Sequence, residues 1–364
     1  MSNVIRLGDY ITEISEKTTV NNQHMVLTSS QEGIVSQDDY FNKQVASKDN
    51  TGYKIIRRGQ FTYRAMSDTG RFYINRLTDY DIGIVSPAYP VFELRTNGQI
   101  LPEYLQEYFH SEHFQNAITL SSTGSTRVSL KLAKIADLRI DIPTLPKQQC
   151  AVQAISHVNH LISMQNSSAA KLDQLVKSRF VEMFGEPIAN THSLPLISLS
   201  EVGSWNSGGT PSRSNPAYFE GDIDWYSAGE LNTLYLEGSV EKVTQDALEN
   251  STAKLFPAGS MLVGMYDTAA FKMGILKWSS ASNQACACIE PNNSIDIVWL
   301  YHVLQIMKPH FLEQRRGIRQ KNLNLGMIKS FQIPYASKPE QNRFASFVSE
   351  VDKSKLSYEM EVAA

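Results

Sequence analysis

The sequence is poor in cysteine, with three in 364 residues. Three cysteines cannot build the disulfide framework of a small secreted protein. They also fall short of the four ligands of a structural zinc site. Cys286 and Cys288 alternate within an expected strand, which favours packing over metal binding. These shortages favour a reduced, cytoplasmic setting, and no metal site is expected.

Long apolar runs and a signal peptide are also missing. The first residues, MSNVIRLGDYITEISEK, lack the basic and apolar regions of a signal peptide. The most apolar stretch, residues 295–307, is interrupted by Asp296, His302 and Gln305 and is too short to span a bilayer. The length and a hydrophobic content of 42% instead suit a protein of two or more globular domains.

Signatures of nucleotide chemistry are absent from the sequence. There is no Gly-x-x-x-x-Gly-Lys-Ser/Thr loop and no glycine-rich cofactor turn after a strand, so ATP chemistry would belong to a partner. Residues 215–218, Asn-Pro-Ala-Tyr, come within one residue of the Asn-Pro-Pro-Tyr sequence of adenine methyltransferases, but we interpret them as a turn. The pairs His110/His113 and His157/His160 have no third ligand nearby, which favours helix-surface roles. We expect a non-catalytic chain, with a self-contained DNA adenine methyltransferase as a minor alternative.

The net charge of -3 argues against nucleic-acid binding on average, but the basic residues are clustered. Residues 51–76 hold six basic residues and one acid, Asp68, and residues 308–329 hold six and one acid, Glu313. Residues 220–249 carry the compensating acidity, with eight acids and one lysine. One basic cluster in each half indicates two faces for a polyanion, although two solvated charged surfaces would give the same pattern.

The most informative feature is an internal repeat at a constant offset of 193 residues, which relates residues 124–158 to residues 317–351 without a gap. The matching pairs are Gly124/Gly317, Leu130/Leu323, Leu132/Leu325, Ile135/Ile328, Ile140/Ile333, Pro146/Pro339, Gln148/Gln341, Ser156/Ser349 and Val158/Val351. A single repeat of this length is not a solenoid, whose periods are roughly 20–50 residues. It indicates a duplicated half-molecule, and such a molecule suits a partner with two similar halves.

The repeat divides the chain into domain, long helix, domain and shorter helix. The predicted segments are residues 1–146, 147–187, 188–338 and 339–364. Within the two β-rich domains we expect strands at residues 53–59 and 60–64 and short helices at residues 102–114 and 298–307. Residues 196–199 parallel residues 4–7 as the opening strand of their domain.

Both helical segments carry apolar residues at heptad spacing. In the central helix these residues are Ile155, Ile162, Ala169, Val176 and Met183, with Val158 and Leu172 in the complementary position. In the C-terminal helix they are Phe344, Val351 and Tyr358, with Phe347 between them. We expect the two helices to pair antiparallel; the alternative is that each packs on its own domain.

The central helix would be about 38 residues and roughly 57 Å long, and residues 163–168 are its weak point, where a bend or break is the alternative to a continuous helix. A paired rod with a domain at each end could act as a ruler on DNA, which advances one turn in roughly 34–36 Å. Two dissimilar basic domains on a pseudo-two-fold frame could read a split, asymmetric DNA sequence with an unread spacer.

Several segments make a specific family resemblance. Residues 170–187, AKLDQLVKSRFVEMFGEP, resemble the central conserved region of the specificity subunits of type I restriction-modification systems. The joints at residues 140–149 and 333–342 are similar to the same family. The opening of the second domain, residues 207–213 with 218–225 and 229–231, is similar to a common target-recognition-domain pattern. The resemblance covers essentially the whole chain.

The resemblance implies an α+β, non-catalytic DNA reader. Two target-recognition domains would each contact one half of a bipartite site, and the paired helices would set the spacer and dock two methyltransferase subunits. S-adenosylmethionine, ATP and magnesium would be bound by those subunits and by separate restriction subunits, with no cofactor in this chain. One departure is that the first domain has Glu16-Lys17-Thr18-Thr19 where the second has Gly-Gly-Thr-Pro.

The candidate DNA contacts are polar or basic residues near tyrosines, and two glycine-centred loops. The single residues are Arg57, Arg58, Arg64, Arg71, Thr210 and Arg213. The loops are Ser122-Thr123-Gly124-Ser125-Thr126-Arg127 and Arg315-Arg316-Gly317-Ile318-Arg319-Gln320-Lys321. Arginine reaches both guanine edges and phosphates, so these residues do not separate base reading from anchoring. A protein-interaction scaffold with two basic domains is the alternative, and it would lack the steep salt dependence of DNA binding.

Overall fold

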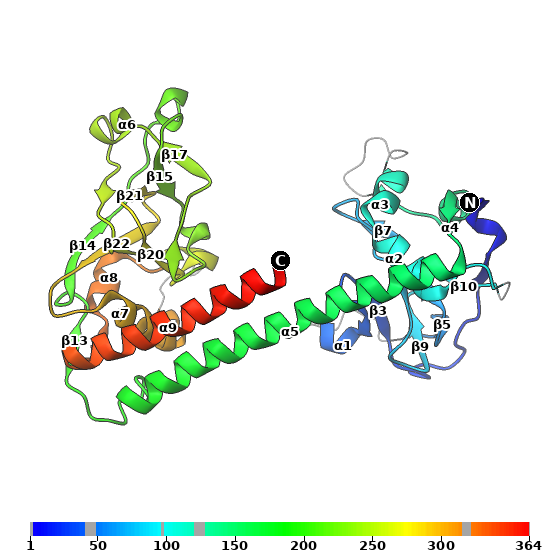
Figure 1. Cartoon of the computed structure of the whole chain (residues 1–364), viewed down its shortest axis with the longest axis horizontal. Coiled ribbons are helices and arrows are strands. Elements are labelled where there is room, and N and C mark those ends of the chain that lie inside the picture. Colours follow the sequence, from blue (N-terminus) through cyan, green and yellow to red (C-terminus); the bar gives the residue numbers. More distant parts are fainter. Residues whose placement is uncertain (1–2, 41–48, 96–97, 120–127, 315–321, 364) are drawn as a thin grey trace. The chain divides into compact units, whose positions relative to one another are not determined.

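The computed structural model describes residues 3–40, 49–95, 98–119, 128–314 and 322–363. The chain divides into two compact units, residues 1–161 and 162–364, and each is built from short strands and helices. Figure 1 shows both units with their elements labelled. The fold is α+β, as expected from the sequence.

The first unit is built from short antiparallel pairings. Its largest sheet has the order β2 (Ile11–Ile14), β10 (Val91–Leu94), β6 (Phe61–Thr62) and β8 (Asn75–Arg76). The smaller pairs are β3 (Leu27–Ser30) with β4 (Gly33–Ser36), β5 (Lys54–Arg57) with β9 (Ile82–Val85), and β7 (Met66–Ser67) with β11 (Val128–Ser129). The strands expected at residues 53–64 are confirmed as β5 and β6. A short helix α1 (Gln37–Tyr40) follows β4.

Helices close the core of the first unit. The helix expected at residues 102–114 is two helices, α2 (Pro102–His110) and α3 (Glu112–Thr119). The backbone is extended at Ser111, whose hydroxyl accepts a hydrogen bond from the Phe114 N–H at 3.3 Å, so Ser111 caps a new helix. The α2 residue Phe109 packs edge-on against Phe61 and Phe92 from the sheet.

The second unit has two sheets. One has the order β14 (Gly203–Ser207), β22 (Cys286–Pro291), β19 (Met261–Gly264), β20 (Met273–Leu276) and β16 (Tyr235–Leu236). The other has the order β17 (Glu241–Val243), β15 (Ile223–Tyr226), β21 (Ser280–Ser282) and β18 (Leu255–Phe256). The short helices are α6 (Gln245–Glu249) and α8 (Leu325–Ser330). The helix expected at residues 298–307 is longer and forms α7 (Ile297–Glu313), capped by Asp296.

The internal repeat is visible in how each unit begins and ends. In the first unit β1 (Asn3–Arg6) pairs antiparallel with β12 (Arg139–Ile142), directly after the small helix α4 (Leu132–Ala136). In the second unit β13 (Leu196–Ser198) pairs antiparallel with β23 (Gln332–Pro334), directly after α8. A long helix follows each pair. The duplicated half-molecule expected from the sequence is therefore confirmed at the level of strand pairing.

The two long helices are α5 (Leu145–Phe184) and α9 (Lys338–Ala363). α5 is helical through residues 163–168, so the break considered there is absent. It begins two residues before Lys147 because Pro146 is tolerated in the first turn of a helix.

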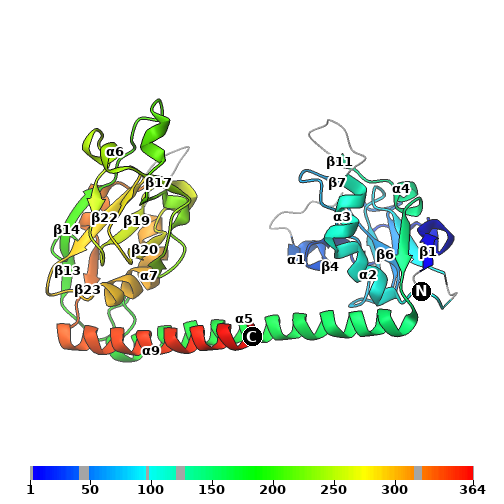
Figure 2. The same cartoon turned by 45° about the horizontal axis from the view of Figure 1, so that its top comes forward.

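α9 packs antiparallel against the later turns of α5. Figures 1 and 2 show the two helices side by side. Phe344, near the start of α9, packs edge-on against Phe180 and Phe184 near the end of α5. Further along α9, Lys355 bonds to Asp173.

The residues expected to pack in this helix pair divide into two groups. Val176, Phe344 and Val351 are buried, and Leu172 and Phe347 pack at the edge of the same core. Ile155, Val158 and Ile162 are exposed, so the packing expected for these three residues is not seen among the described residues. The side chain of Tyr358 lies outside the described residues.

Candidate nucleic-acid interface

Of the four arginines predicted as single DNA contacts in the first domain, outside its glycine-centred loop, three form surface ion pairs. The pairs are Arg57 with Glu16, Arg58 with Asp81, and Arg71 with Glu112. The hydrogen bonds from Arg57 hold the pKa of Glu16 below its usual range. Exposed pairs of this kind contribute little to stability, so a phosphate could displace the carboxylates at little cost.

Arg64 has no hydrogen-bond or ion-pair partner among the described residues. Its side chain is exposed just after β6. Two hollows, of about 260 and 310 Å³, both include Arg64 and Met66 in their walls. The larger hollow is lined by hydroxyl and amide groups, among them Ser29, Ser30, Gln31, Ser67, Thr69 and Tyr73. A free guanidinium beside such donors can contact phosphate oxygens or base edges.

In the second domain the predicted contacts Thr210 and Arg213 bond to other residues of the domain. Arg213 donates to both carboxylate oxygens of Glu241, and its guanidinium lies 4.2 Å from the centre of the Phe219 ring. The Thr210 hydroxyl donates to Gln284. Arg213 therefore links the turn that follows Gly208 and Gly209 to strand β17.

The acidic segment at residues 220–249 has a structural role that the sequence does not reveal. Glu230 accepts from the Ser227 N–H and hydroxyl at 2.8 and 2.6 Å and from the Val240 N–H at 2.8 Å. Burial would raise the pKa of Asp224, but hydrogen bonds from Trp278 and Ser239 lower it below its usual range. These carboxylates hold the loops around β15 in place.

Gly208 and Gly209 are required by close backbone approach. A Cβ on Gly208 would lie 2.3 Å from the carbonyl oxygens of Ser282 and Asn283, and one on Gly209 would lie 2.3 Å from that of Thr252. No side chain fits these gaps. The glycine pair that resembles the target-recognition pattern is thus a packing feature in this chain.

The two glycine-centred loops predicted as DNA contacts, residues 122–127 and 315–321, lie outside the described residues. The elements that flank them are described. The first loop lies between α3 and β11, and the second lies between α7 and α8.

Several of the residues considered for catalysis or metal binding have structural roles. Residues 216–219 form a 3-10 turn, as interpreted from the sequence. Cys286 and Cys288 are buried in β22, and burial raises the pKa of the Cys286 thiol to about 12. The His110 ring bonds to Asn75 at 2.9 Å. Within the part of the chain that the structure describes, no group of three or more His, Cys, Asp and Glu residues is placed to hold a metal ion.

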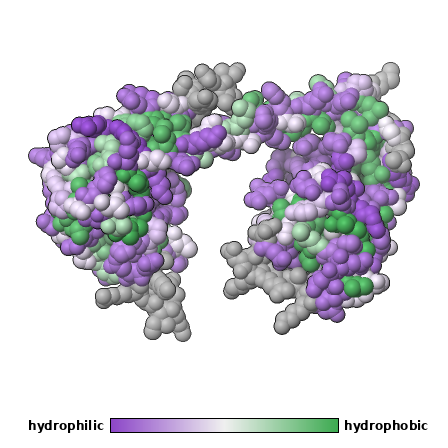
Figure 3. All heavy atoms as spheres, turned by 90° about the horizontal axis from the view of Figure 1, so that it is seen from below, coloured by the Kyte–Doolittle hydropathy of each residue, from purple (hydrophilic) through white to green (hydrophobic). Residues whose placement is uncertain are grey.

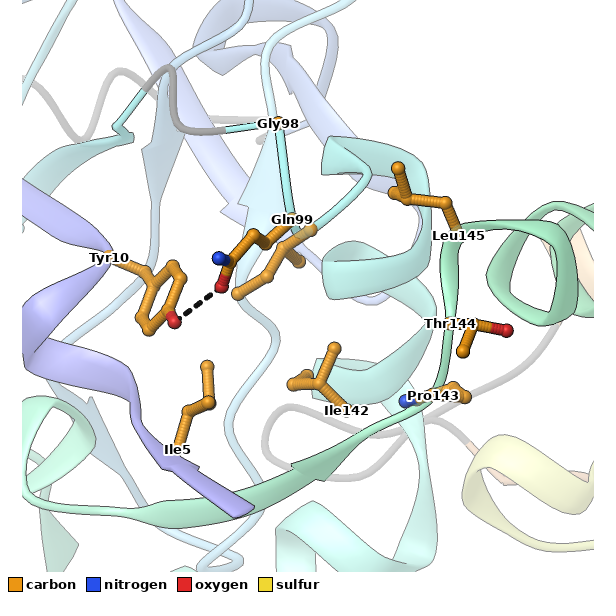
Figure 4. Close-up of a pocket in the computed structure, with 9 residues that line it drawn as sticks. Ile5, Tyr10, Gly98, Gln99, Ile142, Pro143, Thr144 and Leu145 are labelled. Carbon is orange, nitrogen blue, oxygen red and sulfur yellow. Dashed lines mark hydrogen bonds between the residues drawn. The ribbon is translucent and has the colours of Figure 1, made fainter. Parts of the chain in front are cut away.

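A cavity of about 220 Å³ lies where α5 begins in the first unit (Figure 4). It is lined mainly by apolar residues from β1, β12 and the start of α5, such as Ile5, Ile142 and Leu145. The hydroxyl of Tyr10 donates to Gln99 at 2.6 Å across one side. The cavity lies at the joint between the β1–β12 strand pair and the start of α5.

A larger cavity, of about 690 Å³, lies between α5, α7 and α9 of the second unit. Its lining includes Asp173, His302, Asp352 and Lys355. His302 packs edge-on against Phe344, and its Nε2 is shielded from solvent without a hydrogen-bond partner among the described residues. Burial lowers the pKa of His302 to about 4.

Residues 196–361 match the family described as type I restriction modification DNA specificity domain. The chain is 26% identical over 160 residues to the specificity subunit of the type I restriction enzyme EcoR124I/EcoR124II of Escherichia coli, and 24% identical over 159 residues to the MjaIX specificity subunit of Methanocaldococcus jannaschii. Each match covers 42% of this chain. The matches span 40% and 37% of the relatives' own lengths.

Solved structures extend the similarity of fold to the whole chain. The specificity subunit of a type I restriction-modification system from M. genitalium superimposes with a TM-score of 0.58 at 13% identity, over 100% of this chain and 92% of that one. A chain from a structural study of complex assembly in the type I system gives 0.52 at 16% identity, over 100% and 94%. In the described residues, no helix combines the length and apolar character needed to cross a membrane.

Proposed function

We propose that this chain, a member of the family of DNA specificity subunits of type I restriction-modification systems, selects the DNA sequence on which partner subunits act. A specificity subunit is itself non-catalytic. Each of the two β-rich units would read one half of a bipartite, asymmetric site. The long helices would set the unread spacer and dock two methyltransferase subunits.

One observation carries this proposal. The second half matches a DNA specificity domain, and the first half repeats its framework of an opening strand, a closing strand and a long helix. Two versions of one reading domain in a single chain suit two half-sites. Because the loops of the two versions differ in sequence, the half-sites would differ.

Arg64 is the leading contact in the first unit, since no described residue competes for its guanidinium. Arg57, Arg58 and Arg71 would join it by exchanging a carboxylate for a phosphate. In the second unit we assign Arg213 and Thr210 to supporting the reading surface. We keep the loops at residues 122–127 and 315–321 as contacts, because each lies between elements of the duplicated framework.

The cofactors belong to the partners in this proposal. Methyltransferase subunits would carry S-adenosylmethionine, and restriction subunits would carry ATP and magnesium. The complex would act in the cytoplasm, where the DNA is. One similar structure comes from a study of complex assembly in a type I system, which supports a multi-subunit setting.

The test is methylome sequencing of the source cell with and without this chain. Deletion should remove one bipartite, asymmetric adenine-methylation motif, and exchange of residues 1–146 should change only one half of that motif. An unchanged methylome, with the partner genes expressed, would contradict the proposal. A salt titration of DNA binding distinguishes this function from that of a protein-interaction scaffold. Release of counterions makes the affinity for DNA fall steeply as the salt concentration rises.

A further inference from the structure

The main sheets of the two units have matching strand orders, although these strands lie outside the internal repeat. In the first unit the order is β2, β10, β6 and β8, and in the second it begins β14, β22, β19 and β20. Each of these neighbouring pairs is antiparallel. Strand β6 therefore corresponds to β19. The turn after β6 carries Arg64, the leading DNA contact of the first unit, so the turn after β19 is the counterpart of that turn.

A backbone hydrogen bond aligns the two turns residue by residue. The Leu130 N–H donates to the carbonyl of Ala65 at 2.9 Å in the first unit. The Leu323 N–H donates to the carbonyl of Met265 at 2.8 Å in the second unit. Leu130 and Leu323 are matched in the repeat, so the residues that they bond to correspond as well. Two residues further on, the first unit ends β7 and the second has Asp267.

The backbone at Asp267 is held in an uncommon conformation. Its φ is +50°, in the left-handed region that Asp and Asn enter more readily than most other residues. Its N–H donates to the side-chain oxygen of Asn322 at 3.0 Å. Asn322 matches Ser129 in the repeat, and Ser129 pairs with Met66 of β7 in the first unit. Equivalent segments therefore support the two turns.

The turn after β19 presents polar side chains to solvent. Tyr266, Asp267 and Thr268 are exposed. Their side chains form no hydrogen bond or ion pair among the described residues. Hydrophilic residues cover much of the visible face of each unit in Figure 3, so exposure alone does not mark a DNA contact. The position equivalent to the turn of Arg64 is what distinguishes these three residues.

Two lysines lie close together near the end of this turn. Lys272 follows the turn and donates to the carbonyl of Gly229 at 3.2 Å. Burial and the charge of Lys272 lower the pKa of Lys308. A phosphate beside the two ammonium groups would relieve their repulsion. The turn therefore combines groups that suit the DNA backbone with a carboxylate that does not.

The carboxylate separates base reading from anchoring. An arginine can contact either a phosphate or a base edge, whereas a carboxylate repels phosphate and accepts hydrogen bonds only from donors. In the major groove the donors are the exocyclic amino groups of cytosine and adenine. Adenine presents its N7 acceptor beside the amino group, which disfavours a carboxylate, so cytosine is the matching base.

We propose that Asp267 reads a cytosine in the half-site of the second unit, by accepting a hydrogen bond from the exocyclic amino group. Lys272 and Lys308 bind the neighbouring phosphates. The inference rests on the proposed function, and it names one specificity-determining residue and its base.

The test is Asp267→Asn in the source cell, followed by methylome sequencing. Asparagine tolerates the same φ, and its amide pairs with the amino group and N7 of adenine. One position of the second half-site should change from cytosine to adenine, while the first half-site stays the same. With purified chain and two duplexes that differ at this position, the preference for cytosine over adenine should fall by about tenfold or more.

The matched control is Asp246→Asn in α6, where the exposed side chain can keep its 2.8 Å bond to Asn250. It should leave the motif unchanged. A motif that Asp267→Asn does not alter would overturn the inference, and so would a second half-site made only of A·T pairs. Equal losses of affinity for both duplexes would overturn it too, because they would indicate a structural role.

These outcomes are distinct from failure of the proposed function. A methylome that does not change when the whole chain is deleted would remove both the function and the inference. A motif that is lost on deletion but is unaffected by Asp267→Asn would contradict the inference alone.

Discussion

Gln148 and Gln341, 193 residues apart in the sequence, make equivalent sets of three hydrogen bonds in the two units. In the first unit the buried Gln148 accepts from the Leu101 N–H at 2.8 Å, and this residue precedes α2. Its Nε2 donates to the carbonyls of Gln99 at 2.8 Å and Pro143 at 2.9 Å. The first turn of α5 is thereby joined to the start of α2.

In the second unit the buried Gln341 accepts from the Asp296 N–H at 2.7 Å, just before α7. Its Nε2 donates to the carbonyls of Ser294 at 3.3 Å and Ala336 at 2.8 Å. The duplicated framework therefore preserves a side-chain bonding pattern as well as strand order.

Gln148→Leu and Gln341→Leu should each destabilise their own unit by about 2–4 kcal/mol. Each change leaves one N–H and two carbonyls without their bonded partner, and an unsatisfied buried polar group costs about 1–3 kcal/mol. Urea unfolding followed by circular dichroism would measure the loss. Gln149→Leu is the control, because Gln149 is exposed. Similar curves for Gln148→Leu and Gln149→Leu would show that the bonds contribute little.

Gly208→Ala and Gly209→Ala should lower the melting temperature sharply or prevent folding of the second unit. The added methyl group would overlap backbone atoms that cannot rotate away. Gly229→Ala serves as the comparison, since the nearest atom to its added Cβ is 3.8 Å away. Thermal unfolding of the three variants decides the matter. Intact stability of Gly209→Ala together with lost DNA binding would instead assign the glycine pair to the DNA.

Arg64→Ala should weaken binding to the target duplex more than Arg71→Ala does. Arg64 has no described partner, whereas Arg71 is held by Glu112 at 2.6 Å. Loss of one bidentate base contact costs about 1–3 kcal/mol and would relax specificity in one half-site. Loss of a phosphate contact would reduce the salt slope by about 0.9 without changing specificity. Fluorescence anisotropy at several salt concentrations distinguishes a base contact from a phosphate contact. Equal affinities of the Arg64→Ala and Arg71→Ala variants for the duplex would contradict the assignment of Arg64 to the interface.

The buried His302 should make the second unit less stable as the pH falls from 7 to 5. The pKa of His302 is about 4 in the folded chain, below its usual 6.5, so the unfolded chain binds the proton first. Its contribution to stability is present above the unfolded pKa and falls by about 2 kcal/mol between pH 7 and 5. Lys355 adds to the depression and Asp173 opposes it. Burial raises the pKa of Asp352, which acts in the opposite direction as the pH falls.

His302→Gln isolates this effect, because glutamine does not titrate. Urea unfolding of both chains at pH 7 and pH 5 gives the comparison. The variant should lose about 2 kcal/mol less than wild type over this interval. Parallel losses in the two chains would assign the pH dependence to other groups.

Local sequence patterns determined the framework of this protein. Apolar spacing and the absence of glycine and proline predict α5, and the 193-residue repeat predicts two units that open and close alike. The helix follows from residues close together in the chain, and the two units follow from similarity between its halves, so no tertiary contact is needed to predict either. Helix ends were less predictable, because Ser111 starts a new helix through its own side chain and α7 continues through Pro309.

Only the tertiary structure decided which charged side chains are free. The sequence does not distinguish Arg64 from Arg57, because Glu16, which bonds to Arg57, lies 41 residues away in the chain. Nor does it assign Glu241 to Arg213, or show that Val176 is buried and Val158 exposed. The sequence by itself determined the duplicated framework, which the internal repeat predicts, and its helices, which follow from short-range periodicity. The fold decided the pairing of charges and the covering of faces, because both depend on contacts between residues distant in the chain.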